Sequence, residues 1–311
     1  MLLLMAESKN KIIAIMGPTA VGKTDLAIRL SQMMPADIIS VDSAMVYRDM
    51  TIGTAKPSAS ELKIAPHRLI NMCDPAQAYS AGQFCSDANR EIAAIIAQNR
   101  TPLLVGGTML YFHKLFFGLA ELPTADASIR DALSHEAEKM GWEFMHNKLK
   151  TVDPVAAAKI KPQDPQRIQR ALEVFLITGK PISALQKPSV SESAKNIAIQ
   201  IALIPQNRAW LHDRIATRFQ KMLDAGLIDE VRALKNRGDL NPSLPSMRIV
   251  GYRQVWEYLD NHIDFDTMKE KAIAATRQLA KRQMTWLRSW KNAVVFEPQD
   301  EQLVEKVMGL V

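Results

Sequence analysis

One octapeptide near the start of the chain constrains its fold more than any other feature. Residues Gly17–Thr24, GPTAVGKT, fill every fixed position of the pattern G-x-x-x-x-G-K-[ST]. The apolar run 11–16 precedes the octapeptide, and the amphipathic run 25–30 follows it. In such a strand, loop and helix, backbone N–H groups point at anionic oxygens, Lys23 adds positive charge, and the Thr24 hydroxyl can hold Mg²⁺. The sequence therefore predicts a polyphosphate-binding loop rather than glycines that serve only a tight turn.

The alternation of β-type and helical patterns predicts the fold class. Apolar runs typical of strands alternate with helical patterns such as 84–98. The predicted strands are 11–16, 37–41, 102–105, 197–204 and 293–296. This alternation indicates a parallel sheet with helices on both faces. We predict an α/β protein with a P-loop NTPase-like core and an inserted all-helical module.

The middle of the chain lacks strand patterns. Between 118 and 193 the predicted elements are helices, at 129–149 and 166–178. We therefore divide the chain into the first part of the core, an inserted helical module, and the rest of the core with basic C-terminal helices. These three parts are 1–117, 118–193 and 194–311. The C-terminal helices are predicted at about 206–236, 246–260 and 266–290.

Positive charge is concentrated in the second half of the chain. Residues 1–150 carry 15 Lys and Arg against 15 Asp and Glu, whereas 151–311 carry 24 against 18. The segment 271–296 contains no acidic residue. This distribution favours a polyanionic partner larger than a nucleotide, although a solvated helix face gives the same pattern. Trp286 and Trp290 in this segment favour helix packing over base stacking.

Composition argues against membrane, secreted and zinc-dependent proteins. No run approaches the roughly 18 apolar residues of a membrane span. The apolar start 1–5 lacks the basic segment of a signal peptide. Cys73 and Cys85 have neither a CxxC partner nor a matching histidine cluster, which argues against disulfides and zinc. We expect a cytoplasmic protein with reduced thiols.

Polar residues follow the second and third predicted strands. Asp42 directly follows the run 37–41, and Thr108 follows a Gly-Gly pair after 102–105. Ligands of open α/β sheets bind at the carboxyl ends of strands, so both side chains should lie beside the phosphate loop. Asp42 could hold Mg²⁺ through water or accept a proton from a substrate, and a cap or turn is the alternative. Thr108 would be an active-site hydroxyl.

Two arginine pairs are spaced for a single helix face. Arg214 and Arg218 are four residues apart, and Arg167 and Arg170 are three apart. Either pair could clamp a phosphate group, although solvent exposure or salt bridges explain most such pairs.

Ordered motifs cover nearly the whole chain. They lie at 17–24, 42–47, 49–57, 66–69, 104–108, 164–170, 247–253 and 276–288. With this series the chain resembles the bacterial tRNA dimethylallyltransferase family, also called tRNA isopentenyltransferases. Ala44 and Met45 stand where many members have Met-Gln, and the cysteine-ligated zinc finger of the eukaryotic relatives is absent.

The resemblance implies a reaction and its chemistry. Such enzymes transfer a dimethylallyl group from dimethylallyl diphosphate to N6 of the adenosine immediately 3′ of the tRNA anticodon, giving N6-isopentenyladenosine and diphosphate. It implies that Asp42 is the base, that Arg218 and Lys23 neutralise the leaving diphosphate, and that Thr108 positions donor and acceptor. Mg²⁺ is the implied cofactor, at Thr24 with Asp42 acting through water. The implied partners are the tRNA anticodon stem-loop and the donor, with no membrane, and we expect a monomer.

The resemblance also implies the binding residues. The phosphates of the donor, or of a nucleotide such as ATP, would contact Gly17, Pro18, Thr19, Ala20, Val21, Gly22, Lys23 and Thr24. The tRNA would contact Asp42, Ser43, Ala44, Met45, Thr108, Arg130, Gln166, Arg167, Ile168, Gln169, Arg170, Arg248, Ile249, Val250, Gly251, Tyr252, Arg253, Lys281, Arg282, Gln283, Met284, Thr285, Trp286, Leu287 and Arg288. The inserted module would close on the anticodon stem-loop.

Two rival functions use the same residues. A small-molecule or nucleoside kinase would need the phosphate loop, Mg²⁺ and a base such as Asp42, but it gives no reason for the basic C-terminal helix. An RNA-binding regulator would bind RNA without transferring a prenyl group. Nucleoside analysis of tRNA incubated with dimethylallyl diphosphate, or with ATP in parallel, separates these functions.

Overall fold

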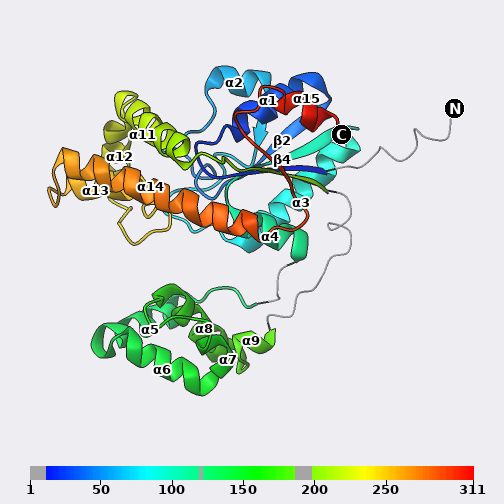
Figure 1. Ribbon diagram of the computed structural model, residues 1–311. Helices are drawn as coiled ribbons and strands as arrows, with labels where there is room; N and C mark the ends of the chain where they lie inside the picture. The colour runs from blue at the N-terminus through cyan, green and yellow to red at the C-terminus, as the bar shows by residue number, and fades with distance from the viewer. Residues whose placement is uncertain (1–11, 119–121, 186–197) are drawn as a thin grey trace. The chain divides into compact units, whose positions relative to one another are not determined.

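The computed structural model describes residues 12–118, 122–185 and 198–311 (Figure 1). The chain divides into two compact units, Met1–Leu115 with Ser193–Val311, and Phe116–Glu192. The second unit lies within two residues of the insertion predicted at 118–193. Residues 1–5, Lys11 and Ile197, on which sequence predictions fall, lie outside the described residues.

A six-stranded parallel sheet forms the centre of the first unit, in the order β3-β2-β4-β1-β5-β6. Its strands are β1 (Ile12–Met16), β2 (Ala36–Val41), β3 (His67–Arg68), β4 (Thr101–Gly106), β5 (Ala198–Leu203) and β6 (Val294–Phe296). The predicted α/β class is confirmed, and the short β3 is an addition to it. Because all strands are parallel, the residues that follow β1, β2 and β4 meet at one edge of the sheet.

Helices cover both faces of this sheet (Figure 1). The helices outside the insertion are α1 (Lys23–Met33), α2 (Ala59–Ile64), α3 (Ala81–Ala97), α4 (Met109–Phe117), α11 (Arg208–Asp224), α12 (Leu227–Asn236), α13 (Tyr252–Leu259), α14 (Phe265–Arg288) and α15 (Leu303–Met308). Of these, α12 and α13 pack on each other and on α11 and α14 rather than on the sheet. Side chains alternate between the faces of a strand, so Ile13 and Ile15 of β1 pack in one core with α1 and α15. Helix α3 packs on the opposite face.

The second unit is helical among its described residues. Its helices are α5 (Ala127–Met140), α6 (Trp142–Val152), α7 (Pro154–Ala157), α8 (Pro165–Thr178) and α9 (Ile182–Leu185). At its centre the Glu173 carboxylate, with no exposed surface, accepts hydrogen bonds from Arg130 Nε at 2.8 Å and Arg170 Nη1 at 2.6 Å. Hydrogen bonding to these arginines holds the pKa of Glu173 below its usual value despite the opposing effect of burial.

Two glycines divide helices that the sequence predicts as continuous. Gly141, with φ of 82°, separates α5 from α6, and Gly226, with φ of 96°, separates α11 from α12. The predictions of single helices over 129–149 and 206–236 were therefore wrong. Glycine adopts these positive φ angles without the clash that a Cβ atom would cause, so each helix ends there and the chain changes direction.

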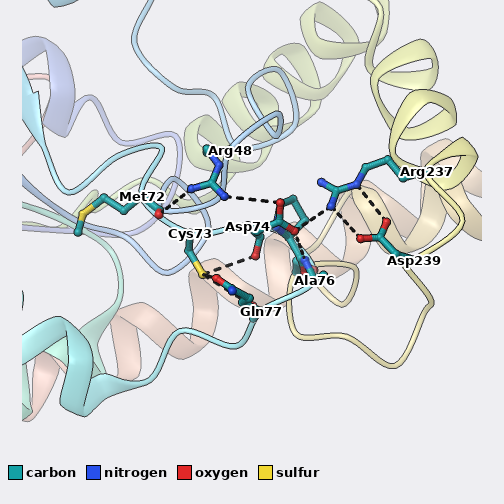
Figure 2. A network of polar contacts seen from close by, with 10 residues as sticks. Arg48, Met72, Cys73, Asp74, Ala76, Gln77, Arg237 and Asp239 are labelled. Carbon is teal, nitrogen blue, oxygen red and sulfur yellow. Dashed lines mark hydrogen bonds and ion pairs between the residues drawn. The ribbon is translucent and has the colours of Figure 1, made fainter.

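A charged network supports the chain segment that follows β2. Figure 2 shows Asp74 between Arg48 and Arg237, with Asp239 beyond it. Arg237 Nη2 lies 2.8 Å from Asp74 Oδ1 and 2.9 Å from Asp239 Oδ2, and Arg48 Nη2 lies 3.6 Å from Asp74 Oδ2. The backbone N–H of Arg48 also donates to the Cys73 carbonyl at 2.8 Å. These contacts join the segment after β2 to the end of α12.

The described residues contain neither a disulfide nor a helix that could span a membrane. Cys73 and Cys85 are both buried and free. Over 12–118, 122–185 and 198–311, we find no helix with the length and apolar content needed to cross a bilayer.

Candidate active site

Strand β1 delivers the phosphate loop to the carboxyl edge of the sheet, and α1 begins at Lys23. At Gly17 a Cβ atom would lie 2.9 Å from the Val21 side chain and 3.1 Å from the Leu203 carbonyl, so only glycine fits there. Gly22 adopts a φ of 100° immediately before the helix. The loop therefore has the geometry of an anion site at a helix N-terminus.

Three charged side chains of the predicted site influence one another. Burial lowers the pKa of Lys23 to about 7, the Asp42 carboxylate opposes this shift, and Arg218 adds to it. Burial likewise lowers the pKa of Arg218, again against the effect of Asp42. Lys23 Nζ donates to the Pro18 carbonyl at 2.7 Å. The fold thus brings together the lysine, aspartate and arginine that the sequence analysis assigned to one site.

The two carboxylate oxygens of Asp42 have different hydrogen-bond environments. Its Oδ1 accepts from the backbone N–H groups of Ala44 at 2.8 Å and Met45 at 3.4 Å, so it holds the turn after β2. Among the described residues no hydrogen-bond donor reaches Oδ2. The turn role considered in the sequence analysis is therefore real, and it leaves one oxygen of Asp42 for chemistry.

Thr108 lies directly against this turn. Its Oγ1 accepts from the backbone N–H of Ser43 at 3.0 Å and lies 3.3 Å from the Ser43 hydroxyl. A Cβ atom at Gly106 would lie 2.0 Å from the Val41 carbonyl oxygen, so glycine is required where β4 passes β2. The ends of β2 and β4 are thereby locked together, as the shared edge of a parallel sheet predicts.

Two cavities meet at this edge. The first, of about 470 Å³, is lined by Asp42, Thr108, Arg218, Arg248, Arg282, Gln283 and Trp286, among others. The second, of about 520 Å³, is lined by Lys23, Thr24, Lys56, Trp210, Arg214, Arg218 and Lys221, among others. Ala20 and Arg218 line both. Arg218 therefore lies between a cation-rich phosphate cavity and a cavity that carries Asp42 and Thr108.

The two arginines of the pair on α11 have different surroundings. Arg214 Nε donates to the Ala20 carbonyl at 2.8 Å, and its guanidinium lies 4.9 Å from the centre of the Trp210 ring. Arg214 thus braces the phosphate loop, whereas Arg218 lies at the junction of the two cavities. Their spacing of four residues predicts one common face of α11, and both line the phosphate cavity.

Helical periodicity sorts the predicted tRNA-contacting residues of the first unit. On α14 the side chains of Met284 and Leu287 are buried, and Tyr252 at the start of α13 is fully buried. The prediction that these side chains contact tRNA is therefore wrong, because a helix inside a fold cannot turn every residue toward a ligand. The exposed ones are Ser43, Arg248, Arg253, Lys281, Arg282, Thr285, Trp286 and Arg288.

Burial also separates the predicted tRNA-contacting residues of the second unit. Ile168 has no exposed surface and packs in the core, so its side chain cannot contact tRNA. The Gln169 amide donates to the Arg130 carbonyl at 3.0 Å. Arg170 pairs with Glu173 and Arg167 with Asp164, so the salt-bridge alternative to a phosphate clamp describes this pair. Gln166 and Arg167 are exposed, and their contact with tRNA stays a prediction.

Trp286, on α14, and Trp290, just after its end, have different environments. Trp290 is buried and donates from its indole N–H to Gln200 Oε1. Trp286 is 38% exposed and lines the first cavity. The Trp286 ring also lies edge-on to His113 of α4, with 5.7 Å between the ring centres, so the packing role predicted for both residues is confirmed.

Glu230 is a site-supporting residue that the sequence did not reveal. Its carboxylate accepts from three consecutive backbone N–H groups, Thr51 at 2.9 Å, Ile52 at 2.7 Å and Gly53 at 3.1 Å, and from the Tyr252 hydroxyl at 2.5 Å. Burial and this carboxylate raise the pKa of Tyr252. Gly53 lines the first cavity, so Glu230 holds one wall of it. No sequence pattern could reveal these contacts, because nearly 180 residues separate Glu230 from the backbone groups that it holds.

Glu230→Gln should lower the free energy of unfolding by about 1–3 kcal/mol, because an amide nitrogen would face N–H donors that lose their acceptor. Denaturant unfolding measures the change. Asp229→Asn is the matched control, since Asp229 is exposed and pairs only with Arg232 one turn away. Equal unfolding midpoints for the two variants would contradict the role assigned to Glu230.

The described residues offer oxygen ligands for a metal but no enclosed metal cluster. No group of three or more His, Cys, Asp or Glu side chains converges within the ranges that the structure describes. Thr24 lines the phosphate cavity, and Asp42 lines the adjoining one. A hydroxyl and a carboxylate beside a phosphate site suit Mg²⁺, which keeps most of its ligands as waters and phosphate oxygens.

A parallel sheet with this loop after β1, and a carboxylate after β2 at the same edge, defines an enzyme of the P-loop class. The family model described as IPP transferase matches residues 45–290. The chain belongs to the IPP transferase family and is a transferase.

Proteins and structures similar to this chain agree with that assignment. A protein named tRNA dimethylallyltransferase from Coxiella burnetii (strain Dugway 5J108-111) is 55% identical over 297 residues, with 96% of each chain covered. One from Thioalkalivibrio sulfidiphilus is 56% identical, covering 92% of this chain and 89% of its own.

Two solved structures are also similar. The full-length tRNA isopentenylpyrophosphate transferase from Bacillus halodurans has a TM-score of 0.69 and 36% identity, covering 97% of this chain and 94% of its own. A eukaryotic dimethylallyltransferase acting on tRNA has a TM-score of 0.80 and 26% identity, with 97% and 77% covered.

Proposed function

We propose that the protein transfers the dimethylallyl group of dimethylallyl diphosphate to N6 of the adenosine immediately 3′ of the tRNA anticodon. The observation that carries this proposal is the position of Arg218 between the phosphate cavity and the cavity of Asp42 and Thr108. A donor whose diphosphate is held in the phosphate cavity would expose its reactive carbon to an acceptor in the cavity of Asp42 and Thr108. The names of the similar proteins supply the chemical identity of donor and acceptor.

The reaction breaks the C–O bond to the diphosphate and forms a C–N bond. Negative charge grows on the leaving diphosphate, where Lys23, Arg218 and the loop amides can stabilise it. The adenine amine is a poor nucleophile because its lone pair is delocalised into the ring. Asp42 accepts the N6 proton as the new bond forms, and its Oδ2 is the oxygen that serves this purpose.

We propose Mg²⁺ as the cofactor, held by the Thr24 hydroxyl and, through water, by Asp42. When bound, the ion supplies positive charge to the diphosphate oxygens. Lys23, Arg218 and the loop amides orient the same group from the protein side.

The acceptor adenine has to leave its stack in the anticodon loop to reach Asp42. The exposed ring of Trp286 lines the cavity that would receive this base and offers it an apolar surface. Arg248 and Arg282 line the same cavity and can contact the flanking phosphates. The donor and acceptor cavities are both formed by one chain, so we propose a monomer as the active form, in the cytoplasm where tRNA is found.

Nucleoside mass spectrometry tests the proposal. Unmodified tRNA is incubated with the protein, Mg²⁺ and dimethylallyl diphosphate, with ATP as the donor in a parallel reaction. We expect N6-isopentenyladenosine in the first reaction only. Phosphate transfer from ATP would favour a kinase, and tRNA binding without any modified nucleoside would favour an RNA-binding regulator.

Neutralising the exposed cations at the end of α14 should weaken tRNA binding in a salt-dependent way. Lys281, Arg282 and Arg288 are exposed, and among the described residues no carboxylate lies within ion-pair distance of them. Their combined change to glutamine should reduce the slope of log affinity against log salt by about one unit per lost contact. Arg277 is left out because it is half-buried, with its Nε inside the protein.

Filter binding or fluorescence titration across salt concentrations measures this slope. Arg29→Gln removes an exposed charge from α1 and serves as the control. If the triple variant keeps the wild-type slope, these cations belong to a solvated face, and tRNA binds elsewhere. Donor affinity should be unchanged in every variant.

A further inference from the structure

Gln283 connects two loops that are far apart in the sequence. Its Oε1 accepts from the backbone N–H of Thr19, in the phosphate loop, at 2.9 Å. Its Nε2 donates to the Gly107 carbonyl, after β4, at 2.9 Å. The sequence analysis assigned Gln283 to tRNA contact, but both ends of its amide are used inside the protein. The planar amide accepts at one loop and donates at the other, which a carboxylate of the same shape cannot do.

The backbone around Gly107 is shaped to admit this side chain. A Cβ atom at Gly107 would lie 2.4 Å from Gln283 Nε2 and 3.2 Å from the Gly17 carbonyl oxygen. A side chain at position 107 would therefore displace the Gln283 amide from the place where the loop after β4 and the phosphate loop come together. Thr108 follows directly and contacts Ser43 at the end of β2. One chain of contacts thus runs from the phosphate loop through Gln283 to the acceptor side.

The position of Gln283 on α14 adds a third partner. Its neighbour Arg282 is exposed and lines the cavity that contains Asp42, whereas Met284 is buried in the core. Gln283 itself is half-buried and lines the same cavity. Gln283 therefore connects the cavity-lining part of α14 to both loops.

We propose that Gln283 is a positioning residue that fixes the phosphate loop relative to the loop 106–108, and that it couples both to α14. This inference rests on the proposed function, because the two loops hold the donor and the acceptor of that reaction. Gln283 does not touch the reacting atoms. It sets the approach of one loop to the other, and a misplacement of about 1 Å is enough to lower a rate by about 100-fold.

Two substitutions separate its two hydrogen bonds. Gln283→Ala removes both bonds. Gln283→Glu keeps the acceptor for Thr19 but places a carboxylate oxygen against the Gly107 carbonyl. Gln278→Ala is the control, since Gln278 is exposed on the same helix and forms no side-chain hydrogen bond with the described residues.

Single-turnover transfer at saturating donor and tRNA gives the first readout. We expect rates about 10- to 100-fold lower for both Gln283 variants and unchanged for Gln278→Ala. The KM for tRNA should change less than the rate. A higher KM with a normal saturating rate would make Gln283 a tRNA ligand and overturn the proposal. A lower melting temperature with a normal rate for the folded fraction would make its role structural only and also overturn it.

Hydrogen exchange with inorganic diphosphate gives a second readout that does not depend on prenyl transfer. In the wild type, diphosphate should slow amide exchange in 17–24 and also in 106–108. In both Gln283 variants, the protection should be confined to 17–24. If 106–108 is unaffected in the wild type, the proposal fails even where transfer occurs. If the coupling is present but no modified nucleoside forms, the proposed function fails and the positioning role stands.

Discussion

Asp42→Asn should lower the single-turnover rate of prenyl transfer by about 10²–10⁴-fold, the usual contribution of a positioned base. Asparagine keeps the shape of the side chain, and its Oδ1 can still accept from the N–H groups of Ala44 and Met45. The turn after β2 is therefore preserved, and only the ability to take a proton is lost. Donor and tRNA affinities should change far less than the rate. Asp49→Asn, an exposed carboxylate seven residues further along the chain, is the control.

Three other results for Asp42→Asn have distinct meanings. If added Mg²⁺ restores most of the rate and donor affinity falls in the variant, Asp42 chiefly organises the metal. If stability falls while the folded fraction transfers normally, only the turn role of Oδ1 matters. A near-normal rate in a stable variant removes Asp42 from the chemistry.

Lys23→Ala should lower turnover by about 10²–10³-fold, the range observed when one donor to a developing anion is removed. The lysine is aimed into the phosphate loop, so donor affinity should fall and tRNA affinity should not. Lys221→Ala is the matched control, because Lys221 lines the same cavity but is exposed to solvent, where its charge is screened. Equal donor affinity in wild type and Lys23→Ala would refute the role of the loop.

The lowered pKa of Lys23 predicts the direction of a pH effect on donor binding. With a pKa of about 7, Lys23 loses its proton as the pH rises above 7. A diphosphate binds the charged form better, so affinity should fall as the pH rises, by up to about tenfold per unit. Calorimetry in buffers of different ionisation enthalpy should show proton uptake on binding above pH 7, and Lys23→Ala should lack that uptake.

The lowered pKa of Lys23 has the opposite consequence for the stability of the ligand-free protein, which rises with pH while donor affinity falls. Between the folded pKa of about 7 and the ordinary value of 10.5, the unfolded chain binds more protons at Lys23 than the folded chain does. The contribution of Lys23 to the free energy of unfolding therefore rises with pH through this window. Lys23→Ala should consequently be at least as stable as the wild type at pH 7, so lost turnover cannot be attributed to unfolding.

The sequence alone determined the parallel sheet, the phosphate loop and the position of Asp42. Each of these depends on a local pattern: an apolar run of strand length, glycines at set spacing, and a polar residue where a strand ends. Because parallel strands place their carboxyl ends at one edge, local patterns on β1, β2 and β4 were sufficient to predict one site. The charge excess of α14 was visible in the same way.

Only the tertiary structure decided which residues support that site and which face outward. Gln283 and Glu230 hold backbone groups 264 and up to 179 residues away, and no local spacing marks such partners. Met284, Leu287 and Ile168 lie within motifs assigned to tRNA but are buried. A motif is contiguous along the chain, whereas burial alternates with the turn of the helix and depends on what packs against it. The physical reason is that side-chain roles are set by neighbours in space, which the chain brings together only on folding.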